Sequence, residues 1–414
     1  MNLKKYSIGT GDRFGYQGKA LLKAIIKAKE NGIDLAVVWN KSFREHKLIN
    51  TKPSDVLGEA QSAVKALNWI GDYYIDADHI NLSNVNLFID SCNFFTLDVA
   101  EYIGKPTPAN LIREFVQKHK NFIGKIKLPV LESSIYIKKS DIEESAKKYL
   151  AIIEEAKKIF MEIEKKKGKN NFIIEISLDE SKEVQTPLEL LIILIAISEE
   201  KIPIQTIAPK FVGEFNKGID YKGNLKNFER DFELILAIIQ FAKTKLILPK
   251  NLKISIHSGS DKFSIYPIIN KLIKKFDTGI HLKTAGTTWL EEIIGLALSS
   301  DEGLELVKEI YKKAYDRYDE LYLPYVNVID INKERLPNPE IVSKWNSKMF
   351  LNVLRHDSSC EYYNPDLRQF FHIAYKIAAE MSSRFLNALE KYNNIIAQNV
   401  TENIYERHIK PLFS

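Results

Sequence analysis

Cysteine is scarce in this chain of 414 residues, which contains only Cys92 and Cys360. The two lie far apart in the sequence, and neither belongs to a CxxC pair. This usage argues against thiolate zinc sites, iron–sulfur clusters and a disulfide framework, and it is typical of proteins from a reducing compartment.

Long apolar segments are missing as well. The longest continuous one runs from Leu190 to Ile197, far short of the ~20 residues that cross a bilayer. The first residues, Met1 to Tyr6, lack the apolar run of a secretory signal peptide. We therefore expect a soluble, cytoplasmic protein that has no membrane partner.

The chain also lacks a strong excess of one charge. The 59 Lys and Arg residues oppose 54 Asp and Glu residues, which leaves a net charge of +5, and the basic residues are spread along the sequence. Nucleic-acid binding is typical of a clustered basic face with interleaved aromatic residues. We therefore expect no nucleic-acid partner. The apolar share of 45% and the charged share of 27% are those of an ordinary folded protein.

Short runs of β-branched and aromatic residues alternate with longer amphipathic runs along most of the chain. The expected strands are Tyr6–Ile8, Leu35–Trp39, Asp72–Asp78, Val85–Asp90, Phe172–Ile176, Ile202–Ile207, Leu252–Ile256 and Gly279–Leu282. This alternation predicts an α/β fold with a parallel sheet. The number of such units favours a closed (β/α)₈ TIM-type barrel over an open Rossmann-like sheet with a helical domain.

The pattern becomes mostly helical near residue 338, with long runs at Glu340–Arg355 and Leu367–Gln398. We therefore predict a catalytic barrel over residues 1–337. Residues 338–414 are expected to form a helical C-terminal extension that packs on the barrel, so that both parts make one structural unit.

Polar side chains collect where the expected strands end. Barrel active sites form at the carboxyl ends of the strands, so we expect these residues to meet at one mouth and to contact a small polar substrate. They are Asp12, Arg13, Asp76, Asp78, His79, Glu175, Gln205, Lys210, His257, His281, Lys283 and Thr284. Arg355 and His356, in a polar loop of the extension, are expected to reach over the substrate.

Three histidines stand at such strand ends: His79, His257 and His281. Neutral imidazole is a common ligand of zinc, nickel, cobalt and manganese, and three protein ligands leave positions open for a substrate. The pattern predicts a divalent-metal site at these three residues. The alternative is that each is a hydrogen-bonded structural histidine.

Carboxylates near the same strand ends are candidates for acid–base work. Asp78 and His79 are adjacent, and adjacent strand residues face opposite sides. Both can reach the mouth only if the strand ends there or a bulge turns one of them. Glu175, between two isoleucines, must point inward and be paired. Its alternative role is a structural ion pair with a lysine.

An anion site is expected after the last strand. Gly286, Thr287 and Thr288 precede a helical pattern and offer backbone N–H groups, with Lys283 beside them. Ordinary capping by threonine is the alternative. The glycine-rich segment 9–15 has the spacing GxGxxxG, which does not fit a dinucleotide site, so no nicotinamide is expected. The sequence has no GxSxG, Walker A or HExxH motif.

Several segments resemble the tagaturonate epimerase family of hexuronate catabolism. They are GTGDRFGYQ (9–17), DADHI (76–80), FVGEFNKGIDYKG (211–223), HSGSDKFSIYP (257–267), HLKTAGTTWLE (281–291) and LRHD (354–357). The resemblance implies a barrel fold and a metal-dependent isomerase that interconverts tagaturonate and fructuronate. It also implies His79, His257 and His281 as metal ligands, with Asp78 and Glu175 as the acid–base pair.

The implied substrate is a small sugar acid, and the implied chemistry is retro-aldol cleavage with re-addition or another acid–base route. Three alternatives stay open: an epimerase of the neutral pair tagatose and fructose, a metal-dependent class II-type aldolase, and a sugar-binding protein without catalysis. A homo-oligomer is compatible with the sequence.

Overall fold

The computed structural model describes residues 1–284 and 286–414. Within these residues, eight strands form a closed parallel barrel with the order β1-β10-β9-β8-β7-β4-β3-β2. The barrel strands are β1 (Tyr6–Thr10), β2 (Leu35–Ser42), β3 (Tyr73–Ile80), β4 (Phe94–Asp98), β7 (Ile173–Ser177), β8 (Thr206–Ala208), β9 (Lys253–His257) and β10 (Ile280–Lys283). The predicted (β/α)₈ barrel is confirmed. Ala285, inside the expected anion site, lies outside the described residues.

One expected strand is wrong. Residues Val85–Leu87 of the segment Val85–Asp90 form a 3₁₀ helix, η1, and the strand β4 follows only at Phe94. The side chains of Asn81 and Asn84 accept hydrogen bonds from nearby backbone N–H groups. Such local bonds compete with strand pairing and favour a turn.

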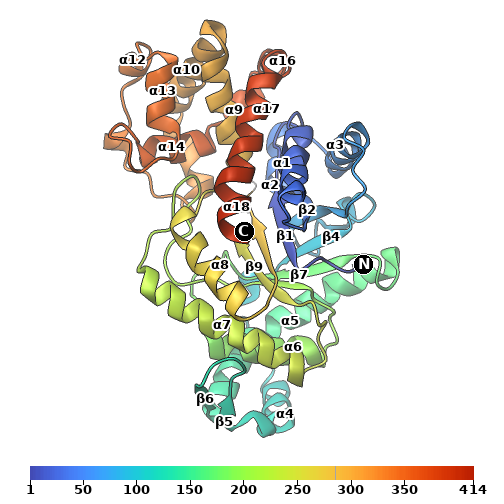
Figure 1. Ribbon diagram of the computed structural model, residues 1–414. Coiled ribbons are helices and arrows are strands. Elements are labelled where there is room, and N and C mark those ends of the chain that lie inside the picture. Colours follow the sequence, from blue (N-terminus) through green and yellow to red (C-terminus); the bar gives the residue numbers. More distant parts are fainter. Residues whose placement is uncertain (285) are drawn as a thin grey trace.

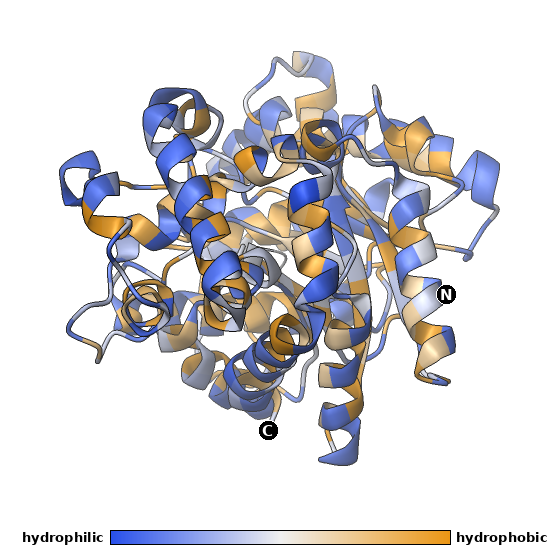
Figure 2. Cartoon of the chain, turned by 90° about the horizontal axis from the view of Figure 1, so that it is seen from above, coloured by the Kyte–Doolittle hydropathy of each residue, from blue (hydrophilic) through white to orange (hydrophobic). Residues whose placement is uncertain are grey.

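Helices cover the outside of the barrel and turn their apolar sides inward (Figure 2). They are α1 (Gly18–Glu30), α2 (Phe43–Ile49), α3 (Pro53–Ala66), α4 (Ala109–Lys118), α5 (Lys139–Lys167), α6 (Pro187–Glu199), α7 (Leu225–Lys245) and α8 (Tyr266–Lys275). The apolar run 190–197 lies in α6, which packs between α5 and α7. No described helix is long and apolar enough to cross a membrane.

Two further groups of elements extend the barrel, mainly toward opposite ends of the molecule (Figure 1). One contains α4 and the hairpin β5 (Gly124–Lys127) and β6 (Ser134–Ile137). The other is the helical C-terminal part: α9 (Gly286–Ser299), α10 (Asp301–Asp316), α11 (Tyr318–Tyr322), α12 (Pro339–Val342), α13 (Ser347–Leu354), α14 (Pro365–Ile373), α15 (Tyr375–Glu380), α16 (Ser383–Lys391), α17 (Asn393–Glu402), the π-helical η7 (Asn403–Ile409) and α18 (Lys410–Phe413). Short 3₁₀ turns are η2 (Ala100–Tyr102), η3 (Lys120–Phe122), η4 (Phe263–Ile265), η5 (Leu323–Tyr325) and η6 (Lys333–Arg335).

The last residues of the chain return to the barrel wall. Helix α17 and η7 pack on α1, and α18 packs on α8, so this segment fills the place between the first and the last helix of the ring (Figure 1). The structure differs from the expected division after residue 337, because the last strand ends at Lys283 and the elements from Gly286 onward are helical. The expected long helix 367–398 is divided into α14, α15, α16 and α17.

The interior of the barrel changes character along its axis. Near the amino ends of the strands, an apolar cluster contains Leu3, Ala36, Val38, Tyr74, Phe94 and Ile173. Because side chains alternate along a strand, the next inward positions on these strands lie one layer nearer the carboxyl ends. These positions are polar and buried: Asn40, Asp76, Thr96 and Glu175. The layers therefore place polar groups toward one mouth of the barrel.

Candidate active site

The end of β3 brings two adjacent polar residues into the mouth. The pairing of β3 with β4 shifts register between Ala77 and Ile80, and His79 has a positive φ of 53°. A bulge of this kind turns a side chain away from the alternating pattern. Asp78 and His79 therefore both face the mouth, which resolves the conflict that strand alternation alone presents.

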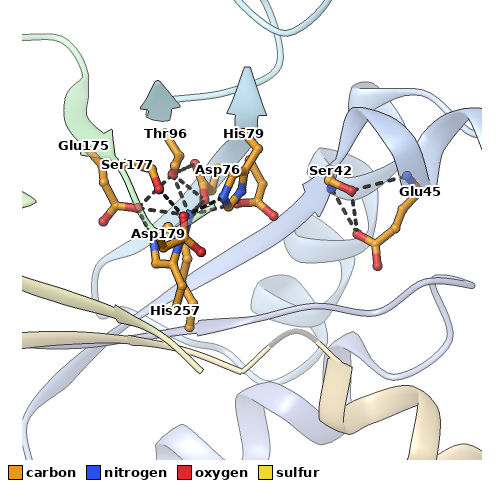
Figure 3. A network of polar contacts seen from close by, with 11 residues as sticks. Ser42, Glu45, Asp76, His79, Thr96, Glu175, Ser177, Asp179 and His257 are labelled. Carbon is orange, nitrogen blue, oxygen red and sulfur yellow. Dashed lines mark hydrogen bonds and ion pairs between the residues drawn. The ribbon is translucent and has the colours of Figure 1, made fainter. Parts of the chain in front are cut away.

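Two histidines share one arrangement of hydrogen bonds (Figure 3). The Nδ1 atom of His79 lies 2.8 Å from Asp78 Oδ1, and its Nε2 atom lies 3.2 Å from Asp179 Oδ1. The Nε2 atom of His257 lies 2.8 Å from Glu175 Oε1, and its Nδ1 atom lies 3.2 Å from the same Asp179 oxygen. Each imidazole thus contacts one buried carboxylate and turns its other nitrogen toward Asp179. Metal-ligating histidines show this arrangement, because a carboxylate fixes the tautomer and the ring orientation.

His79, Asp179 and His257 fit a divalent cation. Among the described residues, these three bring their ligand atoms within 4.8 Å of one another. The Nδ1 atom of His257 is buried and lies 3.2 Å from the Asp179 carboxylate, without the geometry of a hydrogen bond. Two imidazole nitrogens and one carboxylate oxygen are a ligand set for zinc, nickel, cobalt or manganese.

The structure differs from the prediction at the third ligand. His281 is buried inside the barrel, where its Nδ1 atom lies 3.0 Å from Ser7 Oγ and its ring lies against Phe94. It lies two residues before Lys283 on the same face of β10, one layer below the mouth. Burial lowers the pKa of His281 to about 3, so the ring is neutral, as the structural alternative for this residue requires.

Asp179 is the residue that the sequence reasoning missed. It follows β7 by two positions, and the Ser177 hydroxyl donates a hydrogen bond to its carboxylate. The signal was a polar residue directly past the end of a strand, the same signal that identified Asp78 and His79. Burial raises the pKa of Asp179, but the two histidines outweigh it and hold the pKa well below its ordinary value.

Lys283 lies at the centre of the buried carboxylates. Its Nζ atom is 2.8 Å from Asp76, 2.8 Å from Asp78 and 3.1 Å from Glu175, and it donates to the Thr96 hydroxyl at 2.5 Å. Burial lowers the pKa of Lys283, but these carboxylates raise it well above its ordinary value. The ammonium is thus charged and already bonded, so it is not a free partner for a substrate carboxylate.

The three carboxylates around Lys283 are not equivalent. The pKa of Asp78 and that of Glu175 are both raised by burial, but Lys283 and a neighbouring histidine hold each well below its ordinary value. Burial raises the pKa of Asp76 to about 7 despite the opposing effect of Lys283. Glu175 is fully buried and does not line the mouth. It is ion-paired with Lys283, which is the structural role considered above as the alternative to acid–base work.

Two adjoining cavities of about 190 and 380 Å³ form the mouth. Both are lined by Asp78, His79, Glu180, Lys217 and Gly259. The smaller is also lined by Asn40, Lys210, His257 and Lys283, and the larger also by Arg13, Arg44, Lys47 and Asp98. Of the predicted residues, Asp78, His79, His257, Lys283, Lys210 and Arg13 therefore meet at one place.

Two of the expected substrate residues at the mouth have other partners. Arg13 lies 2.9 Å from Glu45 and donates to the His372 carbonyl at 3.0 Å. Lys210 donates from Nζ to the Ser181 carbonyl at 2.5 Å. These two side chains line the mouth, but the guanidinium of Arg13 and the ammonium group of Lys210 already bind other groups of the protein.

Asp12 and Thr284 hold the backbone instead of facing the mouth. The carboxylate of Asp12 accepts from the N–H groups of Phe14 and Gly15 at 2.9 Å each, which fixes the turn after β1. The Thr284 hydroxyl donates to the Gly9 carbonyl at 3.1 Å. Neither residue lines the two cavities.

The structure contradicts the expected substrate contact of Gln205. This residue precedes β8, so it lies at the amino end of the strand, opposite the mouth. Its side chain accepts from the Leu3 N–H at 2.8 Å and donates to the Met1 carbonyl at 3.1 Å. It therefore ties the start of the chain to the barrel floor.

Arg355 and His356 also lie outside the mouth, contrary to expectation. Arg355 donates to Asn399 at 3.2 Å. His356 is buried, with its Nδ1 atom 3.0 Å from Asp261 Oδ2. Arg355 joins two helices of the C-terminal part, and His356 joins this part to the barrel, so their polarity serves packing between elements.

The closed (β/α)₈ barrel and the polar groups at its strand ends define an α/β-barrel enzyme. The profile of one family, UxaE, tagaturonate epimerase, matches residues 1–412. The chain belongs to the tagaturonate epimerase family.

Two relatives are similar to this chain. The tagaturonate/fructuronate epimerase of Thermotoga maritima is 27% identical over 419 residues, which cover 97% of this chain and 80% of the relative. Crystal structures of the fructuronate-tagaturonate epimerase UxaE from Cohnella laeviribosi, one native and two with glycerol, share the fold. The complex with one glycerol has a TM-score of 0.80 and 21% identity, covering 100% of this chain and 82% of that protein.

Proposed function

We propose that this protein interconverts tagaturonate and fructuronate, and that it does so with a divalent cation held by His79, Asp179 and His257. Membership of the family supports the reaction. One observation supports the cation: both imidazoles give one nitrogen to a buried carboxylate and turn the other toward Asp179.

The reaction inverts a carbon that lies one bond beyond the position α to the ketone. The C–H bond at this carbon is not α to the carboxylate either, so its deprotonation gains no enolate stabilisation. Cleavage of the bond to the α carbon avoids this difficulty. The electron pair of that bond stays on the α carbon as an enolate, and the inverted carbon becomes an aldehyde once its hydroxyl loses a proton. Rotation of the aldehyde and renewed bond formation give the epimer.

Asp78 is the residue that would take the hydroxyl proton. It lines both cavities, and its low pKa keeps it ionised. A positioned carboxylate of this kind contributes about 10²–10⁴-fold to a proton-transfer step. Lys283 also lines the mouth, 2.8 Å from Asp78, and would return a proton to the new alkoxide while Asp78 passes its own proton to Lys283.

Glu175 acts in this scheme as a positioning residue. It is buried beneath the mouth and holds His257 at 2.8 Å and Lys283 at 3.1 Å. A bound divalent cation would supply Lewis-acid stabilisation of the charge that develops on the ketone oxygen.

The experiment is an assay of the metal-stripped and metal-restored protein on tagaturonate, with the products identified by NMR. Fructuronate should form, the rate should fall on stripping, and it should return with the metal. An aldolase would instead release two fragments.

Deuterium at the inverted carbon tests the route. Cleavage and re-addition keep the label through many turnovers with little primary isotope effect. Loss of the label to water would contradict the route and favour direct deprotonation. A large primary effect with the label retained would indicate hydride transfer.

A further inference from the structure

The carboxylate of a hexuronate needs a cationic partner, because an ionised group that leaves water must be paired and hydrogen-bonded. The mouth offers several cations, but most are engaged. Lys283, Arg13 and Lys210 already donate to protein oxygens. Arg44 and Lys47 are exposed at the rim. The remaining cation that lines both cavities is Lys217.

Lys217 combines half burial with an open ammonium group. Its side chain is partly covered and borders the same two cavities as Asp78 and His79. Within residues 1–284 and 286–414, no carboxylate lies within ion-pair distance of its Nζ atom. A half-buried cation that has no ion-pair partner and faces a cavity attracts an anion from solvent.

The backbone around Lys217 is fixed on the side of the barrel that carries His257. Its own N–H donates to the Val328 carbonyl at 2.8 Å. The next N–H, that of Gly218, donates to Ser260 Oγ at 2.8 Å, and Lys262 donates to the Asn216 carbonyl at 3.0 Å.

Ser260 and Lys262 belong to the loop that follows His257 at the end of β9, so this loop sets where Lys217 lies relative to the histidine. Gly218 has a φ of 84°, and a Cβ atom there would lie 3.2 Å from Gln369 Cα, so the backbone packs closely at this point. Together with the hydrogen bonds above, this packing holds the loop in place before any ligand arrives, which lowers the cost of binding.

We propose that Lys217 binds the carboxylate of the hexuronate and thereby sets the preference for a sugar acid over a neutral ketose. The proposal rests on the proposed function, since it assumes the same mouth and the same class of substrate. An ammonium–carboxylate bond of this kind corresponds to about a tenfold to a hundredfold change in affinity.

The test compares Lys217→Met with Lys222→Met. Lys222 lies on the same loop, is exposed and pairs with Asp330 at 2.7 Å, so its replacement removes the same charge away from the mouth. Calorimetry with D-tagaturonate and with D-tagatose measures binding to wild type and to both variants, without any need for turnover. Lys217→Met should raise the Kd for tagaturonate by about tenfold to a hundredfold, leave the Kd for tagatose unchanged and keep the wild-type Tm. Lys222→Met should change neither Kd, and Lys217→Arg should restore part of the affinity.

The outcomes separate this proposal from the proposed function. An unchanged Kd for tagaturonate in Lys217→Met, or an equal loss for both sugars, overturns the role of Lys217. Wild-type protein that binds tagaturonate without converting it contradicts the proposed reaction, while the comparison of variants still decides the role of Lys217. Wild-type protein that does not bind tagaturonate overturns both.

Discussion

At the scale of single residues, the site depends on carboxylates that orient imidazoles. His79 and His257 could be predicted from the sequence because histidines are rare in strand patterns and both stand at strand ends. Asp179 carries the weaker signal of a polar residue two positions past β7, where strand alternation no longer indicates which side chains face the mouth. His281 was misplaced because the mouth begins at the last residue of β10, Lys283, and a strand pattern does not fix that residue.

The replacement Asp179→Asn tests the carboxylate that both imidazoles face. It removes a charged ligand, so bound metal and turnover should fall together. The loss of a residue that only orients a ligand costs about 10–100-fold, and we expect a larger loss here. Metal analysis and NMR assays give the two readouts. For bound metal, the controls are Glu180→Gln, at the neighbouring exposed carboxylate, and His281→Gln, and both variants should keep the metal. A fully metallated Asp179→Asn protein would place the site elsewhere.

Glu175→Gln examines an outer partner of the same group. The neutral amide no longer fixes His257, and it leaves Lys283 one carboxylate short. We expect metal affinity to fall about 10–100-fold, with a further loss of kcat that excess metal does not restore. A metal titration followed by activity separates the two effects. Wild-type kcat at saturating metal would contradict the role assigned to Glu175.

At the scale of elements, the strand and helix patterns predicted the barrel, because residues that face the interior recur at regular spacings in the sequence. The pattern failed at 85–90, where local bonds of Asn81 and Asn84 favour a turn. It also failed to divide the helices after residue 367. Breaks such as the one at Ser382, with a φ of 48°, depend on packing between helices and carry no glycine or proline signal.

Helix α7 contains a carboxyl group whose burial predicts a pH effect on stability. Burial raises the pKa of Asp231 to about 6, and its Oδ2 atom has no hydrogen-bond partner among the described residues. In the unfolded chain the pKa is about 3.9. Between these values the folded state binds more protons, so stability falls as pH rises through this range, and the full cost is present above about pH 6.

Asp231→Asn should therefore raise the free energy of unfolding at pH 7, and the gain should shrink as the pH is lowered toward 4.5. Urea unfolding of the variant and of wild type at both pH values measures the difference. A gain that is equal at both would show that the ionised carboxylate is not its cause.

At the scale of the whole molecule, a buried polar cluster joins the barrel to the helical C-terminal part. The Asp261 carboxylate, beyond the end of β9, lies 2.7 Å from Arg368 and 3.0 Å from His356, with His408 at 3.2 Å. No sequence pattern indicates this cluster, because its members lie up to about 150 residues apart and only the packing of the two parts brings them together.

Asp261→Asn should destabilise the protein by about 3–5 kcal/mol, because it leaves the buried Arg368 guanidinium without its counter-charge. Asp330→Asn is the matched control. It breaks the exposed pair with Lys222 and should cost no more than about 1 kcal/mol. Denaturant unfolding measures both. Similar losses for the two variants would contradict the stabilising role of the buried cluster.

The return of the last helices to the barrel wall has a consequence for biosynthesis. The Thr401 hydroxyl donates to the Ala20 carbonyl at 3.0 Å, and 381 positions separate the two residues in the chain. On the ribosome, all barrel strands emerge well before α17, η7 and α18. The apolar sides of α1 and α8 thus stay uncovered in the nascent chain until these last three elements have been made, and exposed surface of this kind is where chaperones bind and aggregation starts.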